Sequence, residues 1–148
     1  MTQFYLVETL EIITKRVTLI EKSSIFGEMK LILIFGTRPE AIKLFPVYQE
    51  LIKNRQLMVK ICLTSQQREL QDQIFDIFEV EADYDLNLMV QNQTLSGLTS
   101  KILSVLTPIL QKEQPDWVLV HGDTTTAFAG ALSAFNERIK VAHIEAGL

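Results

Sequence analysis

The sequence predicts an α/β protein with a doubly wound parallel sheet, and two observations support that fold class. Apolar runs without a polar face recur along the chain, as in strands that helices cover on both sides. Segments with helical spacing separate these runs, and strands joined through helices pair in parallel by right-handed crossovers. The pattern predicts five strands alternating with four helices after residue 28.

Composition agrees with one globular domain. At 148 residues the chain is long enough for a domain with its own core. Charged residues make up 22% and hydrophobic residues 47% of the chain, which is typical of a globular protein rather than a disordered one. The net charge of −4 provides no general attraction to nucleic acid, so we expect no nucleic-acid partner.

Targeting, disulfide and membrane signals are missing from the sequence. Cys62 is the only cysteine, which excludes an internal disulfide and a cysteine-based metal site. No apolar run approaches the roughly 20 residues that a spanning helix requires, so we expect no membrane association. Glu8 and Glu11 stand where a secretory signal would have a basic start and an apolar block. We therefore expect a cytoplasmic protein.

Residues 1–28 differ from the rest of the chain. Their apolar positions fit neither a sustained helix nor a clean strand. We expect a poorly ordered amino-terminal extension, and a regulatory or partner-binding arm is the alternative. The globular domain is expected over residues 29–148.

The first strand and helix form a corner suited to an anion. An apolar run over residues 31–35 predicts a buried strand, Gly36 and Thr37 end it, and Pro39 suits the first turn of a helix. A helix that begins after a tight turn has free backbone N–H groups with partial positive charge behind them. Arg38 and Lys43 add two cations, so we expect a phosphate or another anion to bind there.

The middle of the chain continues the alternation. We expect a strand over residues 57–63 and a short edge strand or an extended loop over residues 83–88. A helix between them should begin with a capping box at Thr64 and Gln67. The helix after Pro39 should have Ile42, Phe45, Gln49 and Ile52 on one side. The helix that begins at Thr94 should bury the set Leu95, Leu98, Ile102, Val105 and Ile109.

The last third has the same pattern. Strands are predicted over residues 117–121 and 140–144, with a helix between them that has many small residues. Its alanines and Gly130 should allow close approach to the sheet, with Phe128, Leu132 and Phe135 as the larger contacts.

Polar residues follow three of the predicted strands. Arg38 and Lys43 come after the first, Asp123 after the fourth and Glu145 after the fifth. Open parallel sheets bind ligands at the carboxyl ends of their strands, so these side chains should share one site. Two carboxylates there suit general acid and base chemistry, and the two cations favour an anionic substrate over a metal ion.

Simpler interpretations remain for each residue. Asp123 is equally suited to capping the helix that follows it, and Glu145 to an ordinary surface position. His121 and His143 end or nearly end strands, where most histidines are structural. Thr124–Thr126 suit phosphate binding and helix-start packing equally well.

Four motifs occur along the chain in this order: Phe-Gly-Thr-Arg-Pro-Glu-Ala-Ile-Lys at 35–43, Thr-Ser-Gln-Gln-Arg-Glu at 64–69, Val-His-Gly-Asp-Thr-Thr-Thr at 120–126 and His-Ile-Glu-Ala-Gly-Leu at 143–148. Together they resemble the non-hydrolysing UDP-N-acetylglucosamine 2-epimerases, and the resemblance runs from about Met29 to Leu148.

The resemblance implies a larger enzyme. Members of that family are isomerases with two Rossmann-like domains that face each other, as in GT-B glycosyltransferases, and residues 29–148 resemble the amino-terminal one. The family's remaining catalytic groups and most of its contacts to uridine diphosphate (UDP) belong to the part that follows. We therefore expect the isolated chain to be inactive. A homodimer and a role in cell-surface polysaccharide biosynthesis are further expectations for the complete enzyme.

The resemblance also implies residue roles. Arg38 and Lys43 match a basic pair that binds the substrate, UDP-N-acetylglucosamine, and Asp123 and Glu145 match carboxylates at its sugar. The implied reaction removes the C2 proton, eliminates UDP to give 2-acetamidoglucal, and adds UDP back to yield UDP-N-acetylmannosamine. It needs no redox cofactor or metal. Gln66 lies in a segment associated with a second, activating substrate molecule, although Gln67 replaces a frequent family histidine.

Two other functions are alternatives to the epimerase. One is a catalytically inactive, truncated nucleotide-sugar-binding module, which would contain the same motifs. The other is the acceptor half of a GT-B glycosyltransferase, which would share the fold but not the four motifs.

Overall fold

The computed structural model describes residues 4–7, 28–64, 78, 80–88, 90 and 92–145. Its centre is a six-stranded sheet with the order β1-β6-β5-β2-β3-β4, and every recorded strand pair is parallel. The strands are β1 (Phe4–Val7), β2 (Met29–Phe35), β3 (Leu57–Leu63), β4 (Tyr84–Asp85), β5 (Trp117–His121) and β6 (Lys140–Ile144). The structure describes the helices α2 (Arg38–Leu51), α4 (Leu95–Glu113) and α5 (Thr125–Asn136).

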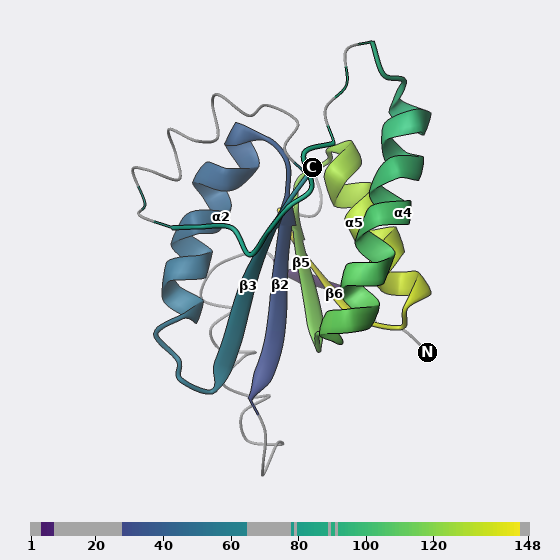
Figure 1. Ribbon diagram of the computed structural model, residues 1–148. Helices are drawn as coiled ribbons and strands as arrows, with labels where there is room; N and C mark the ends of the chain where they lie inside the picture. Colours follow the sequence, from purple (N-terminus) through teal and green to yellow (C-terminus); the bar gives the residue numbers. More distant parts are fainter. Residues whose placement is uncertain are drawn as a thin grey trace.

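Helices cover both faces of the sheet, which confirms the predicted fold class. Figure 1 shows α2 on one side of the strands and α4 with α5 on the other. Strand β2 lies between β3 and β5, so the chain moves outward from β2 first in one direction and then in the other. The order of the strands therefore reverses at β2, and that is where open parallel sheets bind ligands.

The side chains of β2 divide the core in two. Leu33 and Phe35 pack with α2, whereas Ile32 and Ile34 pack with α4 and α5, and all four are fully buried. Burying a side chain of this size contributes about 1.5–3 kcal/mol. A strand with no exposed face has to be apolar at every position, and this explains the run that the sequence showed.

The buried faces of the helices differ from the predicted ones in part. Ile42 and Ile52 of α2 are about half exposed, because α2 turns another set of residues toward the sheet. In α4, Leu95 is exposed. The buried apolar residues are Ala41, Leu44, Phe45, Val47 and Leu51 in α2, and Leu98, Ile102, Leu106 and Leu110 in α4.

Helix α5 approaches the sheet closely, as its small residues predicted. A Cβ atom added at Gly130 would lie 3.3 Å from a methyl group of Val120 and 3.4 Å from one of Ile34. There is consequently no room for large side chains on this face. Phe128 and Phe135 were expected to be core contacts, but they lie on the exposed side of the helix.

Within the amino-terminal extension, the structure describes one short strand. Residues Phe4–Val7 form β1, which pairs in parallel with β6 from Val141 to Ile144 and covers the outer edge of that strand. For these four residues the structure differs from the expected lack of order. Residues 1–3 and 8–27 lie outside the described part of the chain.

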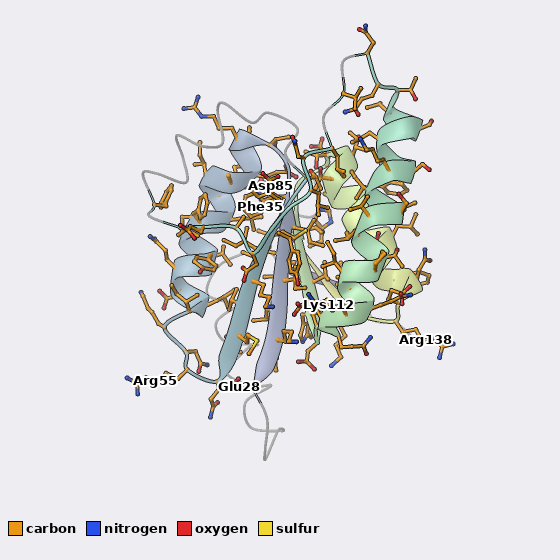
Figure 2. The ribbon with its side chains drawn as sticks, viewed as in Figure 1. Glu28, Phe35, Arg55, Asp85, Lys112 and Arg138 are labelled. Atoms are coloured by element: carbon orange, nitrogen blue, oxygen red, sulfur yellow. The ribbon has the colours of Figure 1, made fainter. Side chains whose placement is uncertain are left out.

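The end of α4 is fixed to the sheet by a buried carboxylate. Glu113 accepts hydrogen bonds from Lys60 Nζ at 2.8 Å, from Lys30 Nζ at 3.4 Å and from the Tyr84 hydroxyl. These contacts, the one from Lys60 first, lower the pKa of Glu113 to about 2. Figure 2 shows Lys112, the neighbour of Glu113, lower in the view than Phe35 and Asp85, and Glu113 itself contacts Lys30 near the start of β2. The cluster therefore stabilises the fold far from the carboxyl ends of the strands.

None of the described helices has the length and apolar composition needed to cross a lipid bilayer.

Candidate functional site

The turns that follow β5 and β6 are joined to each other. His121 and Ile144 end the two strands as register partners, and the Gly122 N–H donates to the Ile144 carbonyl at 3.1 Å. The Gly122 carbonyl accepts a 2.5 Å hydrogen bond from His143 Nε2. A carbonyl can only accept, so Nε2 of His143 carries the proton. His143 therefore has the structural role that its position at a strand end indicated.

Lys43 and Glu145 are in direct contact. Lys43 Nζ lies 2.8 Å from one carboxylate oxygen of Glu145 and 2.6 Å from the other. Each side chain is about half exposed, so the pair is open to solvent and to competing ions. The hydrogen bond from Lys43 is the largest of the effects that lower the pKa of Glu145. Two of the four predicted site residues thus form an ion pair at this edge.

The backbone of Glu145 has an unusual conformation. Its φ angle is 54°, in the left-handed region that costs a non-glycine residue roughly 1–2 kcal/mol. Such conformations persist where surrounding contacts fix them, and they gather at functional sites. The two hydrogen bonds from Lys43 hold the side chain in this geometry.

His121 is buried beneath this ion pair. Its side chain is 5% exposed, and Nε2 lies 3.1 Å from Oε2 of Glu145, out of line for a hydrogen bond. Burial is the main cause that lowers the pKa of His121, and the Glu145 charge opposes it. Since the pKa lies below its ordinary value, His121 is mostly neutral at pH 7. The sequence favoured a structural role for His121, and its burial is compatible with that interpretation.

Asp123 does not cap the helix that follows it. The N-cap of α5 is Thr124, whose hydroxyl accepts from the Ala127 N–H at 3.0 Å. The capping interpretation of Asp123 is therefore wrong, and helix-start packing is correct for Thr124. The Asp123 side chain is exposed, and no hydrogen bond or ion pair to it is recorded among the described residues.

The backbone N–H groups expected to bind an anion already have a partner. Gly36 N–H and Thr37 N–H both donate to Oε2 of Glu40, at 3.0 and 2.7 Å. The prediction of free N–H groups is therefore wrong for Gly36 and Thr37, because the Glu40 carboxylate accepts a hydrogen bond from each of them. Anion binding at this corner then depends on Arg38 and Lys43. Arg38 is exposed and has no recorded partner in the described part of the chain.

Glu40 is the residue that sequence reasoning missed. Its side chain is 2% exposed, and its other oxygen accepts from the Thr124 hydroxyl at 2.6 Å. The local signal was present, since Thr37 followed three residues later by glutamate is a capping-box pattern. The contact with Thr124, 84 residues away, has no local signal.

The family model described as UDP-N-acetylglucosamine 2-epimerase matches residues 49–148, more than half of the chain. The chain belongs to this family. The family model begins at residue 49, so it does not include the motif at 35–43, which indicated the same family.

Curated 2-epimerases are similar over most of this chain. The enzyme named UDP-N-acetylglucosamine 2-epimerase from Neisseria meningitidis is 55% identical over 120 residues, and the one from Escherichia coli K12 is 51% identical over 120 residues. Each match covers 81% of this chain but only 32% of the relative. The chain thus spans about a third of the length of these epimerases.

Solved 2-epimerase structures have the same fold in this region. The Neisseria meningitidis enzyme bound to UDP-GlcNAc matches with a TM-score of 0.78 at 55% identity, over 81% of this chain and 32% of that one. The Methanocaldococcus jannaschii enzyme in complex with UDP-GlcNAc and UDP matches with a TM-score of 0.77 at 41% identity, over 81% and 33%. These matches confirm the predicted relationship to the amino-terminal part of the 2-epimerases.

The candidate activating segment at 64–69 is only partly described by the structure. Gln66 and Gln67 lie outside the described residues. Thr64, which precedes them, is buried and shares a 2.7 Å hydrogen bond with the Thr126 hydroxyl. The role of Gln66 in binding a second substrate molecule stays a prediction.

Proposed function

We propose that this chain supplies part of the active site of a non-hydrolysing UDP-N-acetylglucosamine 2-epimerase. The observation that carries the proposal is the Lys43–Glu145 ion pair, which adjoins buried His121 and the turn that holds Asp123. Cations for an anionic leaving group and carboxylates for a proton are what an elimination at a nucleotide sugar requires.

The reaction proceeds in two balanced steps. A base removes the C2 proton, the electrons of that bond form a C1–C2 double bond, and the bond from C1 to the UDP oxygen breaks. UDP then adds back to C1, and C2 receives a proton on the opposite face. Arg38 and Lys43 stabilise the negative charge that develops on UDP, and Asp123 and Glu145 hold or transfer the proton.

The ion pair suggests how substrate binding prepares Glu145. While Lys43 donates to it, the pKa of Glu145 is lowered and the carboxylate is a weak base. An incoming diphosphate competes for Lys43, because both anions seek the same ammonium group. When Lys43 turns to the diphosphate, the pKa of Glu145 rises and its affinity for a proton increases.

The complete enzyme needs more than these residues. We propose residues 29–148 as its amino-terminal domain, residues 1–28 as an extension, and a second domain for most UDP contacts. A homodimer, the cytoplasm as its location and an activating role for Gln66 belong to the same proposal.

A chimera tests the function directly. The 120 matched residues of this chain would replace the corresponding third of the Neisseria meningitidis relative. We expect conversion of UDP-N-acetylglucosamine to UDP-N-acetylmannosamine, with deuterium entering C2 when the reaction runs in D₂O. The control is the same chimera with Asp123→Asn and Glu145→Gln together, which should fold and lose turnover.

The isolated chain separates the enzyme from a binding module. We expect no conversion by the purified 148 residues, because they correspond to only 32% of the length of the Neisseria meningitidis relative. An inactive chimera, together with NMR shift changes in the isolated chain on addition of UDP-N-acetylglucosamine, would contradict the catalytic proposal and favour the inactive binding module.

A further inference from the structure

Glu40 is a buried carboxylate in the first turn of α2. A charge that is 2% exposed is costly unless hydrogen bonds compensate for the water it has lost. One oxygen, Oε2, accepts from the N–H groups of Gly36 and Thr37 and from the Thr37 hydroxyl at 2.7 Å. These three contacts are local, and they fix the turn between β2 and α2.

The other oxygen reaches a different part of the chain. Oε1 accepts from the hydroxyl of Thr124, which also accepts from the Ala127 N–H. The Thr124 hydroxyl therefore works in both directions, as a donor to Glu40 and as the cap of α5. Because the carboxylate is buried and charged, this bond is stronger than one between neutral groups.

The two turns joined in this way carry the two site residues without recorded partners. Thr37 directly precedes Arg38, and Thr124 directly follows Asp123. We propose that Glu40 is a positioning residue that couples the turn after β2 to the turn after β5 and so fixes Arg38 relative to Asp123. Its consequence for turnover rests on the proposed epimerase function.

The hydrogen bond between Thr124 and Glu40 is the contact that tests this proposal, because the other contacts of Glu40 lie within its own turn and serve the start of α2. Thr124→Asp and Thr124→Asn change it selectively, because aspartate and asparagine have the same shape and cap helices about equally well. Asparagine retains an acceptor for Ala127 and a donor for Glu40. Aspartate retains the acceptor but presents a carboxylate to Glu40. Adding Glu40→Gln to Thr124→Asp restores a donor–acceptor pair with its direction reversed.

The first measurement is amide hydrogen exchange in the full 148-residue chain. Repulsion from Thr124→Asp should displace Glu40, and the Gly36 and Thr37 amides should exchange at least about 5-fold faster. Exchange should stay near the parent rate in Thr124→Asn and return toward it in the double variant. Unchanged exchange in Thr124→Asp would overturn the coupling of the two turns.

The second measurement is steady-state kinetics in the chimera. Misplaced catalytic groups lower kcat more than substrate affinity, so we expect at least about a 10-fold lower kcat for Thr124→Asp with a smaller change in KM. The double variant should regain most of the loss. Glu50→Gln, which removes an exposed carboxylate from the same helix, should have no effect.

The outcomes separate this inference from the proposed function. Faster exchange with normal kcat in Thr124→Asp would overturn the positioning role, and so would a lost kcat that the double variant does not regain. An inactive parent chimera would overturn the proposed function instead, and the exchange rates would then decide whether Glu40 couples the turns.

Discussion

Lys43 in α2 and Glu145 after β6 are 102 residues apart in the sequence, and both carboxylate oxygens of Glu145 lie within 2.8 Å of Lys43 Nζ. The pair connects a helix on one face of the sheet to the end of a strand. It also links a group that can bind an anion to a group that can take a proton, so its loss should change the charge state of the site.

Lys43→Gln should raise the pKa of Glu145. Lys43 lowers this pKa in the folded chain by donating to the carboxylate, and glutamine keeps a donor but removes the charge. A carbon-detected NMR titration of the Glu145 carboxyl group measures the change. Lys53→Gln, which removes a lysine paired with Glu50 at the far end of α2, is the matched control. A Glu145 titration that is the same in Lys43→Gln and in the parent would contradict the assignment.

Asp123→Asn should leave stability unchanged and reduce turnover. Thr124 caps α5, so Asp123 carries no capping bond whose loss would unfold the helix. If Asp123 handles the proton, kcat of the chimera should fall by roughly 10²-fold or more. Thr124→Ala is a control for the stability measurement alone, because losing the cap should cost about 1 kcal/mol of stability. Near-normal turnover in Asp123→Asn would remove this residue from the proposed chemistry.

Glu113→Gln should destabilise the chain at neutral pH by about 2 kcal/mol, since it weakens charged hydrogen bonds to Lys60, Lys30 and Tyr84. The folded pKa of about 2 lies below the ordinary value of 4.5. The ionised carboxylate therefore stabilises the fold above pH 4.5, and this contribution disappears as pH falls toward 2. Urea unfolding at pH 7, 4 and 3 should show the two proteins converging. A constant difference over that range would rule out this explanation.

Deletion of residues 1–7 should promote self-association, because β1 covers the outer edge of β6. An uncovered edge strand presents unpaired N–H and C=O groups to other chains. Sedimentation velocity at increasing concentration measures the effect, and deletion of residues 1–3 alone, which keeps Phe4–Val7, is the control. Equal sedimentation of both deletion variants at all concentrations would argue against a protective role for β1.

The sheet could be predicted from the sequence because its signal is local. A strand covered on both faces, such as β2, has to be apolar throughout, and a short apolar run that ends at a glycine turn favours a strand over a helix. The faces of the helices were harder. Ile42 and Phe128 are apolar but exposed, because the sheet surface beneath each helix decides which side packs, and α5 packs through small residues.

The position of the site could be predicted from the sequence, but its contacts could be predicted only in part. Strand ends placed Lys43 and Glu145 at one edge, and the structure brings them into contact. The partner of Glu40 could not be predicted, because the bond to Thr124 joins segments 84 residues apart. The prediction of free N–H groups was wrong for the same reason. The start of a helix shows that N–H donors exist, but it does not show which acceptor they bind.

The hydrogen bonds from the turn after β2 to Glu40 have a consequence for inhibitor design. Many ligands of nucleotide-binding folds gain affinity by placing a phosphate or carboxylate on the amides of a glycine turn. Here the Gly36 and Thr37 amides are bound to Glu40, so a compound that imitates a phosphate cannot use these two amides without displacing that carboxylate. Selective compounds for this corner should instead place their acidic group against the exposed guanidinium of Arg38.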